Sequence, residues 1–159
     1  MMKRIYKLSL FIFLIALVSG CASTKKSIAS FYDLSPECLR IEKDGSVTLV
    51  SWGQGKNRKQ AIDHAKQKAV DEVLFNVIRD ARSNKIVKPL VLVVNAREKY
   101  DEYFTTFYSK KKYNKFLDMK EASNNDLDKK ANNDEIQVKL VLTVDREGLK
   151  SLLEEDLII

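Results

Sequence analysis

Small apolar side chains recur at every fourth position between residues 57 and 82. They are Ala61, Ala65, Ala69, Val73, Val77 and Ala81, and Ile62, Val70, Leu74 and Ile78 fill the adjacent ridge. This period places all of them on one broad face of an α-helix. Alanine side chains allow such a helix to lie close to a sheet, and Asn57 is a suitable N-cap. We therefore predict a long helix over residues 57–82 that packs on a β-sheet.

The clearest strand pattern lies near the end of the chain. Apolar side chains occupy every second position from residue 136 to residue 144, which is typical of a half-buried strand. Asp145 follows directly and is placed to cap a last helix. That helix carries Leu149, Leu152 and Leu153 on one side.

A pair of strands is expected ahead of the long helix. Apolar runs lie on both sides of Asp44-Gly45, a dipeptide that favours a two-residue hairpin turn. That turn would pair Ile41 with Thr48 across the hairpin. The second strand then ends in Gly53-x-Gly55, just before the long helix.

The middle of the chain has weaker patterns. Residues 90–94 fit either a strand or a buried loop, and residues 113–119 fit a short strand. Residues 96–108 predict a helix with an aromatic face made of Tyr100, Tyr103, Phe104, Phe107 and Tyr108. Residues 121–135 are rich in Asn and poor in apolar residues, so we expect a mobile loop there.

These elements together predict an α+β fold. We expect an antiparallel sheet of about 3–5 strands, packed against the long Ala-rich helix and one or two shorter helices.

The first twenty residues have the layout of a secretory signal. Lys3, Arg4 and Lys7 provide a positive start, and the apolar run of residues 8–18 is too short to cross a membrane as a helix. Residues 1–20 are therefore expected to be removed.

Residues 17–21, Leu-Val-Ser-Gly-Cys, resemble the lipobox of bacterial lipoproteins. In that family the cysteine thiol is joined to diacylglycerol, the chain is cleaved before the cysteine, and the new amino group is acylated. The resemblance implies that Cys21 is the lipid attachment site; the alternative is an ordinary signal peptide with an incidental cysteine. Ala22, in place of an aspartate, resembles the outer-membrane sorting pattern. In lineages that export lipoproteins to the cell surface, an acidic cluster after the cysteine is the usual signal. No such cluster follows Cys21, which favours the periplasmic face.

Removal of the signal changes the composition. It takes three of the 28 basic residues and none of the 22 acidic ones, so the formal charge falls from +6 to +3. This near balance gives little support for a nucleic-acid partner. The small, polar residues 21–30 form the expected lipidated tether, and residues 31–159 form the expected single domain. Cys38 is left as a lone thiol, expected to be buried; the alternative is a disulfide between two molecules.

The domain has few candidates for chemistry. No catalytic residue, metal site or cofactor site is predicted, because the single histidine, His64, lacks a matching nucleophile or ligand set and reads as a surface residue. Gly53-x-Gly55 lacks the lysine of a phosphate-binding loop. Lys110, Lys111 and Lys112 are a possible contact for a partner or an anionic surface; the alternative is a solvated turn.

Three features also resemble a known group of proteins. They are the strand ending in Gly53-Gln54-Gly55, the Ala-rich helix, and the closing sequence VDREGLKSLLEEDLII. Over residues 39–159 the chain resembles the superfamily of the Helicobacter membrane-associated lipoprotein and the N-terminal domain of the flagellar H-ring protein, and especially uncharacterised Bacteroidetes lipoproteins. The resemblance implies a compact α+β domain without catalytic residues, and a role in the cell envelope.

We therefore expect a lipid-anchored protein, not an enzyme, that binds or supports a periplasmic or outer-membrane protein partner. The membrane would hold it through the acylated Cys21. The alternative is a small-ligand or lipid-binding lipoprotein that uses an apolar groove beside the helix at 96–108.

Overall fold

A computed structural model describes residues 35–80, 82–119, 130–131 and 135–159. These belong to one compact unit that spans residues 31–159. The expected signal, Cys21 and the tether lie outside the described residues, as does most of the loop expected at 121–135.

The main sheet is antiparallel, and its strands follow the order β1-β2-β7-β5. Its strands are β1 (Glu37–Ile41), β2 (Val47–Gly55), β5 (Leu117–Met119), β6 (Lys130–Ala131) and β7 (Glu135–Val144). Both β5 and β6 pair with β7, β6 at its start and β5 at its end. A separate two-stranded sheet joins β3 (Ile78–Arg79) and β4 (Ile86–Val87).

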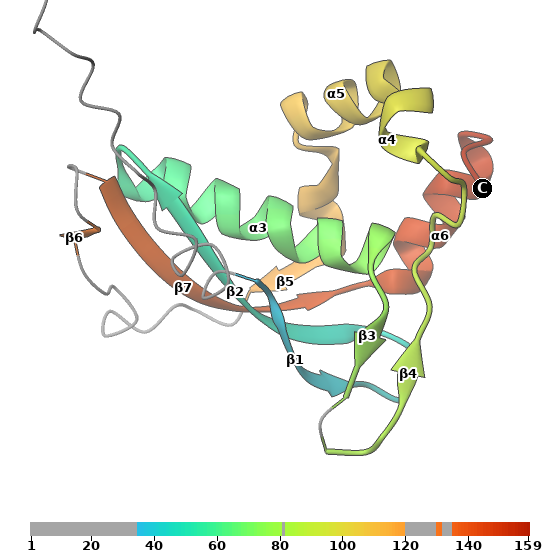
Figure 1. Cartoon of the computed structure of the whole chain (residues 1–159), viewed down its shortest axis with the longest axis horizontal. Coiled ribbons are helices and arrows are strands. Elements are labelled where there is room, and N and C mark those ends of the chain that lie inside the picture. Colours follow the sequence, from blue (N-terminus) through green and yellow to red (C-terminus); the bar gives the residue numbers. More distant parts are fainter. Residues whose placement is uncertain (1–34, 81, 120–129, 132–134) are drawn as a thin grey trace, which may run out of the picture. The chain divides into compact units, whose positions relative to one another are not determined.

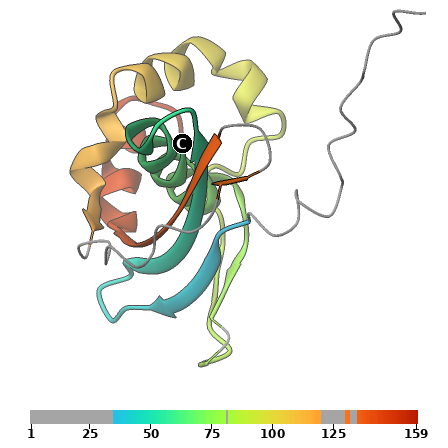
Figure 2. The ribbon, with the colours of Figure 1, turned by 90° about the vertical axis from the view of Figure 1, so that its left-hand side faces the viewer.

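The helices are α3 (Arg58–Phe75), α4 (Ala96–Lys99), α5 (Asp101–Ser109) and α6 (Arg146–Glu155), with a 3₁₀ helix, η1 (Lys112–Phe116), after α5. In both views α3 runs along one face of the sheet, and α4 and α5 lie on the opposite side of α3 (Figures 1 and 2). The predicted α+β class, with an antiparallel sheet against a long Ala-rich helix, is confirmed.

The helix α3 lies very close to β2, as its alanines predict. Ala61, Ala65 and Ala69 are fully buried. The Ser51 hydroxyl donates a 2.7 Å hydrogen bond to the Ala65 carbonyl oxygen. A Cβ atom on Gly53 would stand only 1.9 Å from the Ala61 carbonyl oxygen and 2.5 Å from the Ala65 nitrogen. Glycine is thus required at position 53 because the helix backbone occupies the space of a side chain.

The start of α3 is capped as predicted. The Asn57 Oδ1 atom accepts from the Gln60 N–H at 2.9 Å, while the Gln60 side chain accepts from the Lys56 N–H at 3.1 Å. The pattern is similar to a capping box, but the Gln60 side chain accepts from Lys56, the residue before the N-cap, and not from Asn57 itself.

The end of α3 differs from the prediction. The helix stops at Phe75 rather than at residue 82, and Val77 is 52% exposed. The reason is tertiary, because the segment after Pro89 supplies hydrogen bonds to the last turn. The Leu90 N–H donates to the Val73 carbonyl at 3.3 Å, and the Val91 N–H donates to the Leu74 carbonyl at 2.9 Å. Carbonyls that a longer helix would satisfy are satisfied here by another segment.

This docking also explains why residues 90–94 form no strand. Leu90 and Val91 are buried, whereas Leu92 and Val94 are 71% and 83% exposed. The apolar run is therefore split between a buried anchor and an exposed loop.

The first hairpin has a different turn from the one predicted. The Glu42 N–H donates to the Ser46 carbonyl at 2.8 Å, so the loop has three residues, and Gly45 has φ +88°. A three-residue loop with a left-handed third residue is a common hairpin connection. It shifts the register by one, and Ile41 pairs with Val47 rather than with Thr48.

The segment 113–119 is only partly a strand. Its first residues continue the 3₁₀ helix η1, and only Leu117–Met119 pairs with β7. Within the expected loop at 121–135, Lys130–Ala131 forms the short strand β6. The helix predicted at 96–108 is present as α4 and α5, which meet at Tyr100.

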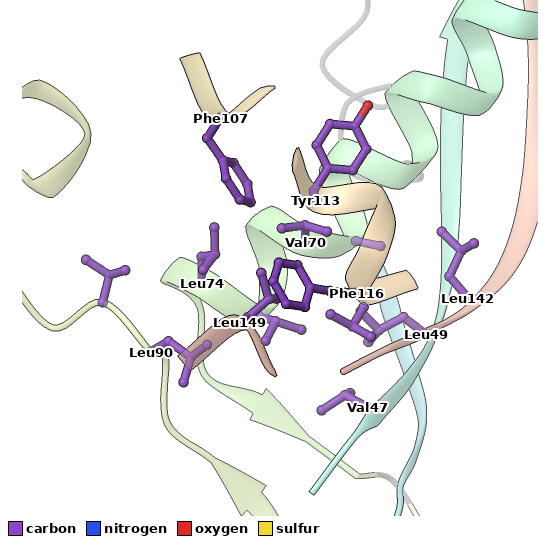
Figure 3. Packing of buried hydrophobic residues seen from close by; sticks show 14 of the residues in the cluster. Val47, Leu49, Val70, Leu74, Leu90, Phe107, Tyr113, Phe116, Leu142 and Leu149 are labelled. Atoms are coloured by element: carbon purple, nitrogen blue, oxygen red, sulfur yellow. The ribbon is translucent and has the colours of Figure 1, made fainter. Parts of the chain in front are cut away.

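The core lies between the sheet and α3 and continues toward η1 and α6. Figure 3 shows Val47, Leu49 and Leu142 from the sheet, Val70 and Leu74 from α3, Phe107, Tyr113 and Phe116, and Leu149 from α6. Each fully buried leucine or valine of this kind stabilises the fold by about 1.5–3 kcal/mol.

A buried carboxylate holds the turn between β3 and β4. Asp80 is 4% exposed, and its oxygens accept from the Ser83 hydroxyl at 2.6 Å and the Arg82 N–H at 2.8 Å. It also accepts a longer bond, 3.4 Å, from the Ile41 N–H of β1. These hydrogen bonds, the one from Ser83 most of all, lower the pKa of Asp80 to about 2.

This pKa predicts a pH-dependent effect of Asp80→Asn. A carboxylate whose pKa is lower in the folded state adds stability above its unfolded pKa, about 3.9, and loses it as the pH falls toward 2. At pH 7 we expect Asp80→Asn to unfold at a lower urea concentration than the native chain. The difference between the two urea midpoints should narrow below about pH 4 and nearly vanish near pH 2. Urea titrations at a series of pH values would measure it.

Asp118→Asn is the matched control, because Asp118 is an exposed carboxylate on β5. Its urea midpoint should stay near the native value throughout. If the urea midpoint of Asp80→Asn stays below the native midpoint by the same amount from pH 7 to pH 2, the charge of Asp80 does not have the proposed role.

Candidate ligand-binding groove

A second face of α3, separate from its alanine face, carries a stripe of larger and mostly polar side chains. Asp63, Gln67, Asp71 and Phe75 follow one another at four-residue spacing. All four contact the segment from α4 to η1 through hydrogen bonds, ion pairs or ring contacts. The helix α3 therefore serves two layers, the sheet on one side and α4–α5 on the other.

An open groove of about 510 Å³ lies between α3 and the α4–α5 pair. Gln67, Asp71 and Phe75 line it from α3, and Arg97, Asp101, Phe104, Thr105 and Tyr108 line it from α4–α5. This volume is in the usual range of ligand pockets. The lining combines three aromatic rings with two carboxylates, one guanidinium, an amide and two hydroxyls.

Arg97, which lines this groove, is held by two groups of α3. Its guanidinium nitrogen lies 2.9 Å from Asp71 Oδ2, and its guanidinium carbon lies 4.1 Å from the centre of the Phe75 ring. The Phe75 ring in turn meets the edge of Phe104, with centroids 5.2 Å apart. The guanidinium thus makes a cation–π contact with the ring and a charge-assisted contact with the carboxylate, and both interactions are favourable.

The other oxygen of Asp71 also has a partner. The Tyr108 hydroxyl donates a short hydrogen bond to Asp71 Oδ1. Burial of the Tyr108 ring, and then the Asp71 charge, raise the pKa of Tyr108 well above its usual range. Tyr108 therefore stays protonated at any physiological pH and acts as a fixed donor. Asp71 thus joins the two sides of the groove, since Tyr108 and Arg97 both come from the opposite wall.

Further contacts fix one end of the groove. Lys111 Nζ lies 2.5 Å from Asp63 Oδ2, and the Gln67 amide donates to the Tyr113 hydroxyl at 3.4 Å. The hydrogen bond that Lys111 donates to Asp63 raises the pKa of Lys111. At the opposite end of α3, the bonds of its last carbonyls to the segment after Pro89 fix the second wall.

The three lysines singled out in the sequence are not equivalent. Lys111 is bound to Asp63 and has a left-handed backbone, with φ 52°. Lys110 and Lys112 are exposed. A contact with a partner or an anionic surface therefore stays a prediction that falls mainly on these two residues.

The predicted aromatic stripe is mostly core. Phe104 and Phe107 are 5% and 1% exposed, and Tyr103 reaches the end of α6, where its hydroxyl donates to Asp156 at 2.8 Å. The groove lies on the side of Phe104 and Tyr108, not at Tyr103 and Phe107, and its lining is mixed rather than apolar.

The other sequence candidates lie away from the groove. His64 is exposed on α3, and its Nδ1 atom lies 3.1 Å from both the nitrogen and the carbonyl oxygen of Gln54 at the end of β2. Cys38 is partly buried and unbridged, and burial raises the pKa of its thiol. Gly53 and Gly55 lie against α3, whose atoms occupy the space that a side chain at either position would need.

Sequence reasoning missed Asp71 and Arg97 as site residues. The signal was present as the four-residue spacing from Asp63 to Phe75, which marks a second contact face of α3. What the spacing does not reveal is which segment covers that face.

Within the described ranges, no helix has the length and apolar character needed to cross a membrane. Nor do the described side chains include a cluster of three or more His, Cys, Asp or Glu residues arranged to hold a metal ion.

Comparison of the chain with the models of known protein families, with curated proteins and with solved structures finds no match. The resemblance to the Helicobacter-type lipoproteins stays a prediction based on the sequence features given above.

Proposed function

We propose that this protein is a lipid-anchored binding component of a bacterial cell envelope, and that it is not an enzyme. In this proposal Cys21 carries the lipid at the outer membrane and the domain faces the periplasm. The domain holds a segment of an envelope protein in the groove between α3 and α4–α5. The observation that carries the binding role is the groove itself, with Arg97 held between Phe75 and Asp71.

The mixed lining favours a protein segment over a lipid chain. A lipid chain needs a continuous apolar surface, whereas Gln67, Asp71, Arg97 and Asp101 put polar groups along this groove. Aromatic rings beside arginine are typical of the residues that dominate protein–protein contacts. A bound peptide would use both kinds of group.

Site-specific photocrosslinking tests this proposal. A benzoylphenylalanine at Thr105, which lines the groove, should give a discrete crosslinked product in intact cells that contain the full chain in its native envelope. The matched control replaces Glu102, which is exposed on the same helix but outside the groove, with benzoylphenylalanine. It should give little of that product. Equal products at both positions, or none at Thr105, would count against the groove as the binding surface.

A further inference from the structure

The groove already contains a basic side chain, and that side chain is the chain's own Arg97. Its guanidinium is bound by an aromatic ring at 4.1 Å and by a carboxylate at 2.9 Å. The side chain of Arg97 is nevertheless 58% exposed. The binding of Arg97 shows that this lining is chemically suited to a guanidinium or an ammonium group.

A second carboxylate lines the same groove. Asp101, in the first turn of α5, is exposed and makes no ion pair within the part of the chain that the structure describes. Phe104, Thr105 and Tyr108 line the groove beside it. This side of the groove therefore offers aromatic rings beside a carboxylate, the same two kinds of group that bind Arg97.

The charges of the lining distinguish between cationic and anionic ligands. Asp71 and Asp101 outnumber Arg97, so the formal charge of the lining is negative. Asp71 lies against Arg97 and compensates its charge. A carboxylate or phosphate would therefore approach two acidic groups and an arginine that is already paired, whereas a cation gains from Asp101.

We propose that the groove recognises a lysine or arginine side chain in an extended segment of a partner protein, next to Arg97 and paired with Asp101. This inference rests on the proposed function and adds the chemical class of the bound segment. The apolar part of the basic side chain would lie on Phe104 and Tyr108, and its charge would reach Asp101.

Three short peptides test the proposal. They are acetyl-Gly-Arg-Gly-amide, the same peptide with citrulline, which replaces the guanidinium by an uncharged urea, and the same peptide with glutamate. Each is titrated into the full chain in detergent, and NMR follows the amide signals of Phe104 and Thr105. We expect the arginine peptide to bind about fivefold more tightly than the citrulline peptide, the upper range for one exposed ion pair. The glutamate peptide should bind most weakly.

Asp101→Asn should remove the preference for arginine over citrulline and leave the weak binding of the citrulline peptide unchanged. Glu102→Gln is the matched control, because Glu102 is the neighbouring acidic residue in the same first turn of α5 but does not line the groove. It should keep the preference. A preference that survives Asp101→Asn would overturn the assignment of Asp101.

Two other results would also reject this inference, and neither decides the proposed function. If the glutamate peptide binds as tightly as the arginine peptide, then Arg97 is the anchor for an anion, and the groove remains a binding surface. If none of the peptides shifts the two amide signals, the basic-segment site is wrong. The photocrosslink at Thr105 tests separately whether any partner occupies the groove.

Discussion

Gly53→Ala should destabilise the domain by about 3 kcal/mol or more, which is a large part of the stability of a domain of this size. The added Cβ would stand 1.9 Å from the Ala61 carbonyl oxygen and 2.5 Å from the Ala65 nitrogen. Both atoms belong to the backbone of α3, so no side-chain rotation relieves the clash. The helix must move away from β2, and the Ser51 bond to Ala65 must lengthen. Urea unfolding of the purified chain would measure the loss.

Gln54→Ala is the matched control on the same strand. Gln54 lies on the opposite face of β2 from Gly53, and its contact with His64 uses backbone atoms that the substitution keeps. We expect a change within about 0.5 kcal/mol. A Gly53→Ala variant as stable as this control would mean that α3 does not approach β2 as closely as described.

Cys21→Ser should abolish lipid anchoring, because serine offers no thiol for the thioether to diacylglycerol. The variant should keep residues 1–20 and lack the mass of the acyl chains, since the resemblance to the lipobox places cleavage after modification. Intact mass spectrometry would show both effects. The retained apolar run of residues 8–18 can itself hold the variant on membranes, so the mass of the intact chain, and not membrane retention, decides the outcome.

Cys38→Ser is the control for this experiment. Cys38 is the other cysteine of the chain and packs, partly buried, at the edge of the core. Its replacement should leave the protein processed, acylated and membrane-bound. The lipobox hypothesis would be wrong if Cys21→Ser were still processed and acylated.

The parts of the fold that depend on local patterns were predictable from the sequence. The Ala-rich helix, its cap at Asn57, the alternating strand β7 and the helix after Asp145 are all present. Each of these patterns reports which face of an element is buried, and the number of buried faces largely determines the fold class.

Features that depend on contacts between distant segments were not predictable. The apolar period of α3 continues to residue 81, yet the helix ends at Phe75 because Leu90 and Val91 bind its last carbonyls. The register of the first hairpin was missed for a local reason. Asp44-Gly45 fits both a two-residue and a three-residue loop, and the sequence alone does not choose between them.

The same distinction holds for the candidate site. The sequence placed an aromatic face on the helix at 96–108, and most of it is buried as core. The polar stripe on α3 was also readable from spacing, but its covering by Arg97 and Tyr108 requires the path of the chain between Asn76 and Asn95. That path depends on the β3–β4 hairpin and on the Asp80 contacts.

The groove is fixed at both ends of its α3 wall, and this determines how it would respond to a ligand. The Lys111–Asp63 pair holds one end, the bonds of Leu90 and Val91 hold the other, and Asp71 joins the walls between them. A protein segment that enters would meet walls already at their final spacing, so little ordering cost accompanies binding. Free and bound forms should then share nearly the same backbone. The domain would act as a preorganised receptor and would not transmit binding as a change of shape.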